Sequence, residues 1–223
     1  MNRNFFKPFV GREYGKGIHG KKILVLGASF YCSHGPESKV PCPFFSECTS
    51  IETKDSSKFD LSCPFYAENG QKLSEEPSNA IAENYKAYQN FGRFMQQFAE
   101  KDVEDIWQRM AFTDYVQFFL PTTETKLTYL SQRDFDAFNE VLVDLKPDIL
   151  VVWGEVINKV VRDKNPYVVD KANLPNTEWY ISHIRMPQIP KSITLLCSYH
   201  PSAPIWNKDL GNLTKYMEQA LKE

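Results

Sequence analysis

Four runs of apolar residues divide the chain, and each is rich in β-branched or aromatic side chains. They lie within residues 21–31, 110–119, 148–154 and 193–199. A continuous apolar run of this length is typical of a strand that is buried on both faces, as in a parallel sheet covered by helices. The pattern therefore predicts four buried strands.

Between these runs, apolar residues recur at every third or fourth position, which indicates helices with one apolar face. The helical segments are Ser78 to Glu100, Ser131 to Pro147, Glu155 to about Val161, and about Asn207 to Leu221. Strands that alternate with helices form parallel βαβ units. We therefore expect an α/β fold with a four-stranded parallel sheet, in one domain over residues 1–223. Residues 179–184 predict an additional edge strand or hairpin arm.

Two segments lack sustained periodicity. Residues 1–20 predict an irregular arm that lies across the domain, and residues 32–77 predict an insertion rich in proline and cysteine. The arm has the aromatic anchors Phe5, Phe6, Phe9 and Tyr14. The first 22 residues hold six basic side chains and one acid, so any phosphate contact there would be local. A solvated, flexible arm is the alternative.

Composition sets the outer limits. The chain has 223 residues, 42% hydrophobic and 24% charged, which is enough for one well-cored domain. A formal net charge of −2 argues against a general attraction to nucleic acid. No apolar run reaches the roughly 18 residues of a membrane span, and the amino terminus lacks the apolar core of a signal peptide. We expect a soluble, cytoplasmic monomer with no membrane partner.

Four of the five cysteines cluster in the insertion, at Cys32, Cys42, Cys48 and Cys63. In a reducing compartment, clustered thiols suggest a zinc or iron–sulfur site more than disulfides. However, the gaps are longer than those of the paired C-x2-4-C ligands of structural zinc sites. Ordinary buried thiols are therefore the favoured interpretation, and we expect no cofactor.

The predicted strands end in residues that can carry chemistry. The four motifs are Gly27-x-x-x-Tyr31, Phe112-Thr113-Asp114-Tyr115-Val116, Trp153-Gly154 and His200-Pro201-Ser202. Ligands of open α/β sheets bind beyond the carboxyl ends of the strands, where glycine lets the backbone turn and approach a ligand closely.

Together, in this order, the motifs resemble those of the uracil-DNA glycosylase superfamily, from about Lys21 to the end of the chain. The resemblance implies a three-layer α/β/α sandwich around a four-stranded parallel sheet, which agrees with the pattern above. It also implies an enzyme that flips a deaminated base, uracil or a relative, out of single- or double-stranded DNA and hydrolyses its N-glycosidic bond.

The resemblance also implies roles for individual residues. His200 would stabilise the negative charge on the departing base, Ser202 would hold a DNA phosphate, and Ser29 would position water. The base-binding positions are Gly27, Ala28, Phe30, Tyr31, Phe44 and Asp114. In this set Tyr31 shapes the pocket floor, and Phe44 or Phe45 stacks on the base.

This chain departs from the family pattern at three places. The family places a carboxylate or amide one or two residues after the first glycine, where this chain has Ala28 and Ser29, so a general base is missing. Phe30 replaces the usual proline. Asp114 replaces an asparagine that both donates to and accepts from uracil. An ionised aspartate only accepts, which suits a donor–donor edge such as that of guanine-like bases, unless the aspartate is protonated.

Two alternatives remain open at this stage. A catalytically weak or inactive member would bind a nucleobase, a nucleotide or single-stranded nucleic acid in the same crevice. A Ser29–His200 hydrolase is the other, because both residues end neighbouring strands, but the sequence around Ser29 lacks the Gly-x-Ser-x-Gly pattern of such enzymes.

Overall fold

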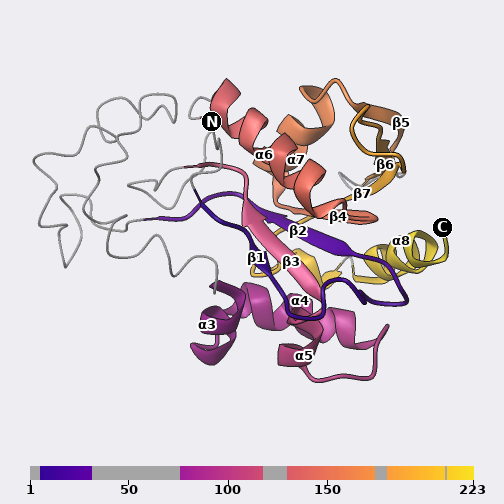
Figure 1. Cartoon of the computed structure of the whole chain (residues 1–223). Coiled ribbons are helices and arrows are strands. Elements are labelled where there is room, and N and C mark those ends of the chain that lie inside the picture. Colours follow the sequence, from indigo (N-terminus) through magenta and orange to yellow (C-terminus); the bar gives the residue numbers. More distant parts are fainter. Residues whose placement is uncertain (1–5, 32–75, 118–129, 174–179, 209) are drawn as a thin grey trace, which may run out of the picture.

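The structure is a computed structural model that describes residues 6–31, 76–117, 130–173, 180–208 and 210–223 (Figure 1). Within these residues a seven-stranded sheet has the order β1-β3-β2-β4-β7-β6-β5. Its strands are β1 (Phe9–Val10), β2 (Ile23–Gly27), β3 (Met110–Asp114), β4 (Ile149–Trp153), β5 (Val168–Asn173), β6 (Tyr180–Ile184) and β7 (Ile193–Ser198).

The four predicted buried strands are the central strands β3, β2, β4 and β7, and they are mutually parallel. The α/β class is confirmed, but the prediction of a four-stranded, purely parallel sheet is wrong. β1 adds an antiparallel edge beside β3, and β6 and β5 extend the sheet beyond β7 as an antiparallel hairpin. Two residues are too few to show a strand pattern in sequence, and the polar content of β5 concealed its periodicity.

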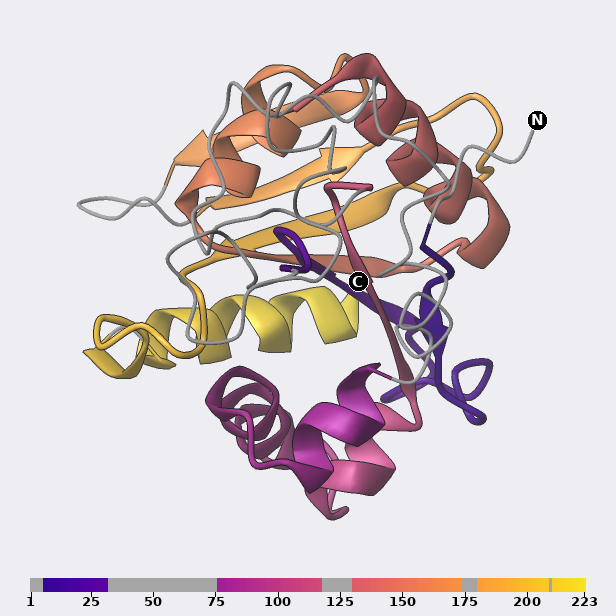
Figure 2. The same cartoon turned by 90° about the vertical axis from the view of Figure 1, so that its left-hand side faces the viewer.

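Helices cover both faces of the sheet (Figures 1 and 2). One face carries α6 (Gln132–Leu145) and α7 (Glu155–Asp163), and the other carries α4 (Lys86–Gln96), α5 (Val103–Trp107) and α8 (Leu210–Lys222). Because side chains alternate along a strand, Leu24 and Leu26 join the core under α6 and α7. Ile23 and Val25 join the core under α4 and α8.

The predicted single helix from Ser78 to Glu100 is wrong, because the segment forms two helices, α3 (Glu76–Ala82) and α4. Asn84 separates them with φ of 58°, in the left-handed region that asparagine tolerates better than most residues. The Tyr85 amide donates to the Ala80 carbonyl at 2.8 Å and closes the end of α3. The break lets α4 begin at Lys86 with its own direction.

Residues 6–20 of the predicted arm pack against the domain, but the arm is not irregular throughout, because Phe9–Val10 form β1 beside β3. Phe6, Phe9 and Tyr14 are buried, while Phe5 lies outside the described residues. The Phe6 amide donates to Gln117 Oε1 at 3.1 Å, which attaches the arm to the segment after β3. The described part of the arm is therefore packed against the domain and is not the solvated arm that was the alternative.

A buried hydrogen-bond network connects that segment to the start of α6. The carboxylate of Asp134, which is fully buried, accepts from the Gln117 amide and from the Ser131 amide, each at 2.8 Å. Gln117 Nε2 in turn donates to the Asp114 carbonyl at 2.9 Å. The network therefore holds the backbone of the predicted site residue Asp114.

No helix within the described ranges is long and apolar enough to cross a membrane.

We expect Asp134→Ala to lower the free energy of unfolding by about 2–4 kcal/mol, because it leaves the buried Gln117 amide and the partly buried Ser131 amide without their acceptor. Urea denaturation followed by circular dichroism measures this change. Asp144→Ala, on the exposed face of the same helix, is the matched control and should change stability by less than about 0.5 kcal/mol. Equal losses for the two variants would contradict a structural role for the network.

Candidate functional site

The carboxyl ends of the four parallel strands lie at one level. Gly27 is paired with Asp114, Leu26 with Val152, and Trp153 with Ser198. Asp114, Gly27, Trp153 and Ser198 therefore form a row across β3, β2, β4 and β7. By strand alternation this row belongs to the face covered by α4, where Phe112 and Trp153 are part of the core.

At one end of the row, the Asp114 side chain lies over Gly27. A Cβ atom at Gly27 would overlap Asp114 Oδ1 and the tip of the Phe112 ring. The sequence suggested that Gly27 allows close approach of a ligand, and the structure adds that it makes room for the Asp114 carboxylate. Asp114 is 5% exposed, so it is a buried acid at the mouth of the strands.

At the other end, the His200-Pro201-Ser202 turn follows β7. Ser202 Oγ lies 2.7 Å from His200 Nδ1, and the Ser202 amide donates to the same nitrogen at 3.3 Å. The Pro201 carbonyl accepts from Asn90 Nδ2 of α4 at 2.8 Å. The turn is therefore fixed both internally and against α4.

The end of β4 supports the histidine ring. The rings of Trp153 and His200 meet edge to face, with centroids 5.8 Å apart. Gly154 follows with φ of 89° and ψ of 151°, a combination that side-chain-bearing residues rarely adopt, and its amide donates to the Ser198 carbonyl at 2.8 Å. The second position of the Trp-Gly motif thus requires glycine because of its backbone dihedral angles.

These contacts determine the protonation state of His200. A backbone amide can only donate, so Nδ1 accepts from Ser202, and the proton of the neutral ring is on Nε2. Burial lowers the pKa of His200, which also favours the neutral ring. The side chain is therefore a neutral N–H donor, the kind of group that can stabilise a developing oxyanion. In this arrangement the hydroxyl and the backbone amide of Ser202 both donate to His200, although the Ser202 side chain is exposed to solvent.

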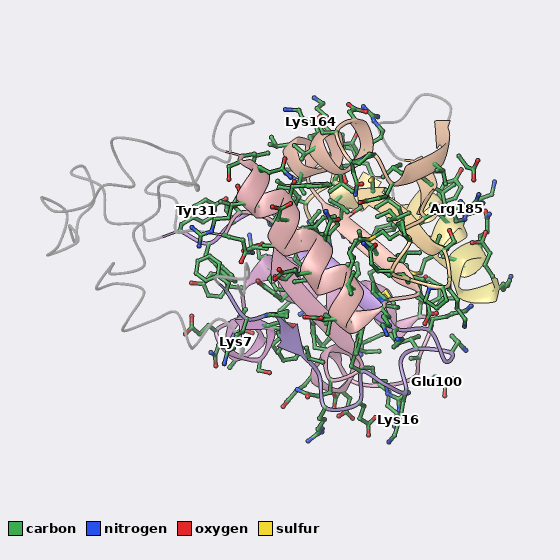
Figure 3. The ribbon with its side chains drawn as sticks, turned by 45° about the horizontal axis from the view of Figure 1, so that its top comes forward. Lys7, Lys16, Tyr31, Glu100, Lys164 and Arg185 are labelled. Atoms are coloured by element: carbon green, nitrogen blue, oxygen red, sulfur yellow. The ribbon has the colours of Figure 1, made fainter. Side chains whose placement is uncertain are left out.

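The residues after Gly27 are divided between the two sides of the sheet. Ser29 is buried at 8% exposure, and the Ala28 carbonyl accepts from the Val116 amide at 3.0 Å. Phe30 packs edge to face against Phe6 of the arm, at 5.2 Å between ring centroids. Tyr31, labelled in Figure 3, is partly exposed where the described segment ends.

Ser29 and His200 do not end neighbouring strands, which corrects the premise of the hydrolase alternative. β4 lies between β2 and β7, so the axes of these strands are about 10 Å apart. That distance exceeds hydrogen-bond reach, and His200 Nδ1 is already bonded to Ser202. A directly paired serine nucleophile and histidine base is therefore not supported.

Phe44 and Phe45 lie outside the described residues, as do Cys32, Cys42, Cys48 and Cys63. Among the residues that the structure describes, no three histidine, cysteine or acidic side chains gather closely enough to hold a metal ion.

Sequence reasoning missed three residues that build the site. Gln117 and Asn90 fix the two ends of the row through their amide side chains, and Phe6 packs onto Phe30. A glutamine directly after the apolar run of β3 was a usable signal, because a polar side chain there must find partners once buried. Asn90 had no such signal, since its partner is far away in the chain.

No protein-family model matches this sequence, and no curated protein matches it either. The functional assignment therefore rests on the residues and their geometry.

The protonation state of His200 gives a testable titration. Its pKa, read from the imidazole C–H signals in NMR spectra, should lie below the ordinary histidine value. Ser202→Ala should raise the pKa, because it removes a donor to the neutral ring. Ser202→Thr keeps a hydroxyl and should leave the pKa close to that of the wild type.

The same titration has a consequence for stability. The pKa of His200 is lower in the folded chain than in the unfolded chain, so the unfolded chain binds a proton more readily. The stability that the neutral His200 contributes to the folded state is therefore lost as the pH falls below about 6.5. The assigned tautomer would be contradicted if the pKa of His200 were above the ordinary histidine value. It would also be contradicted if Ser202→Ala lowered that pKa.

Proposed function

We propose that this chain is a DNA base-excision glycosylase that acts on a flipped-out deaminated base and hydrolyses its N-glycosidic bond. The observation that carries the proposal is the contact of His200 Nδ1 with the hydroxyl and the amide of Ser202, which assigns the proton of the neutral ring to Nε2. A donor of this kind stabilises the charge that a departing base gains as the bond breaks.

The meeting of the four motifs supports the same assignment. The motifs that resemble the uracil-DNA glycosylase superfamily are far apart in sequence, yet all four follow or end the parallel strands at one edge of the sheet. Helices on both faces are in keeping with the sandwich that the resemblance implies (Figure 2). An α/β fold alone would not support a function, but this convergence is specific to the site.

The reaction needs a leaving base and an attacking water. The bond between C1′ and the base nitrogen breaks with its electron pair on the base, whose oxygen accepts a hydrogen bond from His200 Nε2. Water adds its oxygen to C1′, and its proton passes through solvent to the base. Ser29 orients this water, and the absence of a carboxylate at Ala28 and Ser29 removes roughly a hundredfold or more of the rate.

An exposed apolar side chain beside the histidine turn supports action on DNA. Ile205 is 40% exposed and lies five residues after His200. Apolar side chains next to a binding crevice can insert between base steps and take the place of an extruded base. Ile205 fills this role for a duplex substrate.

A single-turnover assay with oligonucleotides that carry uracil, hypoxanthine or xanthine tests the proposal, with single- and double-stranded forms compared. We expect slow base release from at least one substrate, and His200→Ala should reduce the release rate by roughly 10²–10³-fold. Release that survives in His200→Ala would overturn the assignment of this residue, and no release from any substrate would overturn the enzyme.

Asp114 indicates the class of base. Its carboxylate lies at the strand ends over Gly27, and an ionised carboxylate accepts but does not donate. An N–H group satisfies it, whereas a carbonyl oxygen does not, and uracil, hypoxanthine and xanthine each place a carbonyl next to the N–H. A guanine-type edge, with adjacent N1–H and N2–H groups, satisfies it fully. We therefore propose that uracil is a poor substrate and that a base with such an edge is a better one.

Asp114→Asn tests this preference, because an amide both donates and accepts. The variant should release uracil roughly tenfold faster than the wild type, which corresponds to one mismatched buried hydrogen bond. The ratio of the two single-turnover rates on the uracil oligonucleotide is the readout. Wild type that releases uracil as readily as Asp114→Asn would contradict the role of the carboxylate.

One observation favours a second function. The positions after Gly27 hold Ala28 and the buried Ser29, neither of which is a general base. A protein that binds the base or a single strand in the same crevice without cleaving it would need no such group. DNA binding at low salt without base release would identify this function.

A further inference from the structure

The basic side of α4 lies beside the histidine turn. Asn90, in the middle of α4, donates to the Pro201 carbonyl at 2.8 Å. Residues three and four positions apart share one side of a helix, so Lys86 and Arg93 lie on the same side as Asn90. The same side continues to Gln97, whose Oε1 lies 3.4 Å from Thr214 Oγ1 of α8.

A second contact fixes the segment after the turn on α4. Trp206, in the short 3-10 helix η5 (Trp206–Lys208), is buried against Phe91 and Phe94 of α4, with ring centroids 6.2 and 5.9 Å apart. The exposed Lys208 ends this element. The turn, η5 and α4 therefore form one continuous surface, with His200 at its inner edge.

The charged side chains within α4 and within residues 200–208 are basic. α4 contains Lys86 and Arg93 and no acid, and residues 200–208 contain Lys208 and no acid. All three cations are exposed, and within the described ranges none of them is in an ion pair. In a chain of net charge −2, a helix with two basic side chains and no acid next to the site is a local exception.

We propose that the Lys86–Arg93 side of α4 binds the phosphates of the DNA strand that flanks the flipped base. Seven residues of helix separate the two cations, or about 10 Å along the axis, which matches roughly three nucleotides of rise along one strand. The two side chains therefore contact separate phosphates. That the ligand is DNA rests on the proposed function. The residues that bind it here lie on α4, away from the reacting atoms.

The test is the salt dependence of binding to a fluorescent duplex of about 20 base pairs, measured by anisotropy between about 50 and 200 mM NaCl. Lys86→Gln combined with Arg93→Gln should lower the slope of log Kd against log salt by about 1.8, which is two phosphate contacts at about 0.9 each. At about 0.1 M salt, Kd should rise at least roughly tenfold.

Lys159→Gln combined with Lys164→Gln is the matched control. These lysines are exposed and belong to α7 or its end, on the opposite side of the sheet from α4, so the net charge changes equally (Figures 1 and 3). The control should keep the slope and Kd of the wild type. An equal loss of slope in both double variants would overturn the proposal, because total charge would then account for the effect.

The outcomes separate this surface from the glycosylase itself. With saturating DNA, the α4 variant should release base within about threefold of the wild-type rate, since neither cation touches His200. A wild type that binds DNA but releases no base, with the slope still lost in the α4 variant, would keep the surface and reject the enzyme. Normal base release with an unchanged slope would reject the surface alone.

Discussion

The hydrogen-bonded register of the four parallel strands is the constraint on which the candidate site depends. Because β3, β2, β4 and β7 end at the same level, Asp114, Gly27, Trp153 and Ser198 form one row on one face. A slip of a single residue in β3 would exchange its faces and present Thr113 in place of Asp114. The apolar burial of both faces opposes such a slip, so the packing of the core also determines the geometry of the site.

Burial on both faces also explains the cost of placing polar groups there. The buried carboxylate of Asp134 and the buried side chain of Gln117 need hydrogen-bond partners. Asp134 accepts from the Gln117 amide, and Gln117 donates to the Asp114 carbonyl, so each supplies a partner to the segment after β3. The absence of a side chain at Gly27 provides the space for Asp114. At the other end of the row, Ser202 and Trp153 contact His200, and neither side chain adds a charge. The site is therefore rigid at both ends.

The central strands could be predicted from the sequence because strands buried on both faces appear as continuous apolar runs, as in Ile23–Gly27 and Ile149–Trp153. The outer strands could not, since β1 has two residues and β5 is largely polar. Asn84 broke an apparently continuous helix through backbone conformation, which periodicity does not record.

The candidate site, like the fold, could be predicted only in part. Strand ends located Asp114 and His200, because the ends of parallel strands meet at one edge of the sheet. Strand order is a property of the whole fold, however, so the sequence suggested that Ser29 and His200 end neighbouring strands when β4 lies between them. The contact of Asn90 with Pro201 likewise depends on how α4 packs, over a separation of 111 residues.

The neutrality of His200 has a consequence for how binding and chemistry are divided. A neutral donor stabilises charge that develops as the base leaves, but it has little Coulomb attraction for the phosphates of an intact substrate. Affinity must then come from other groups, and the overall charge of −2 cannot supply it. The cations that we propose on α4 would meet this need at the edge of the site, where they would attract the backbone equally before and during the reaction. Under the proposed function, the surface would supply binding energy, and the partly buried His200 would supply the energy difference that accelerates bond cleavage.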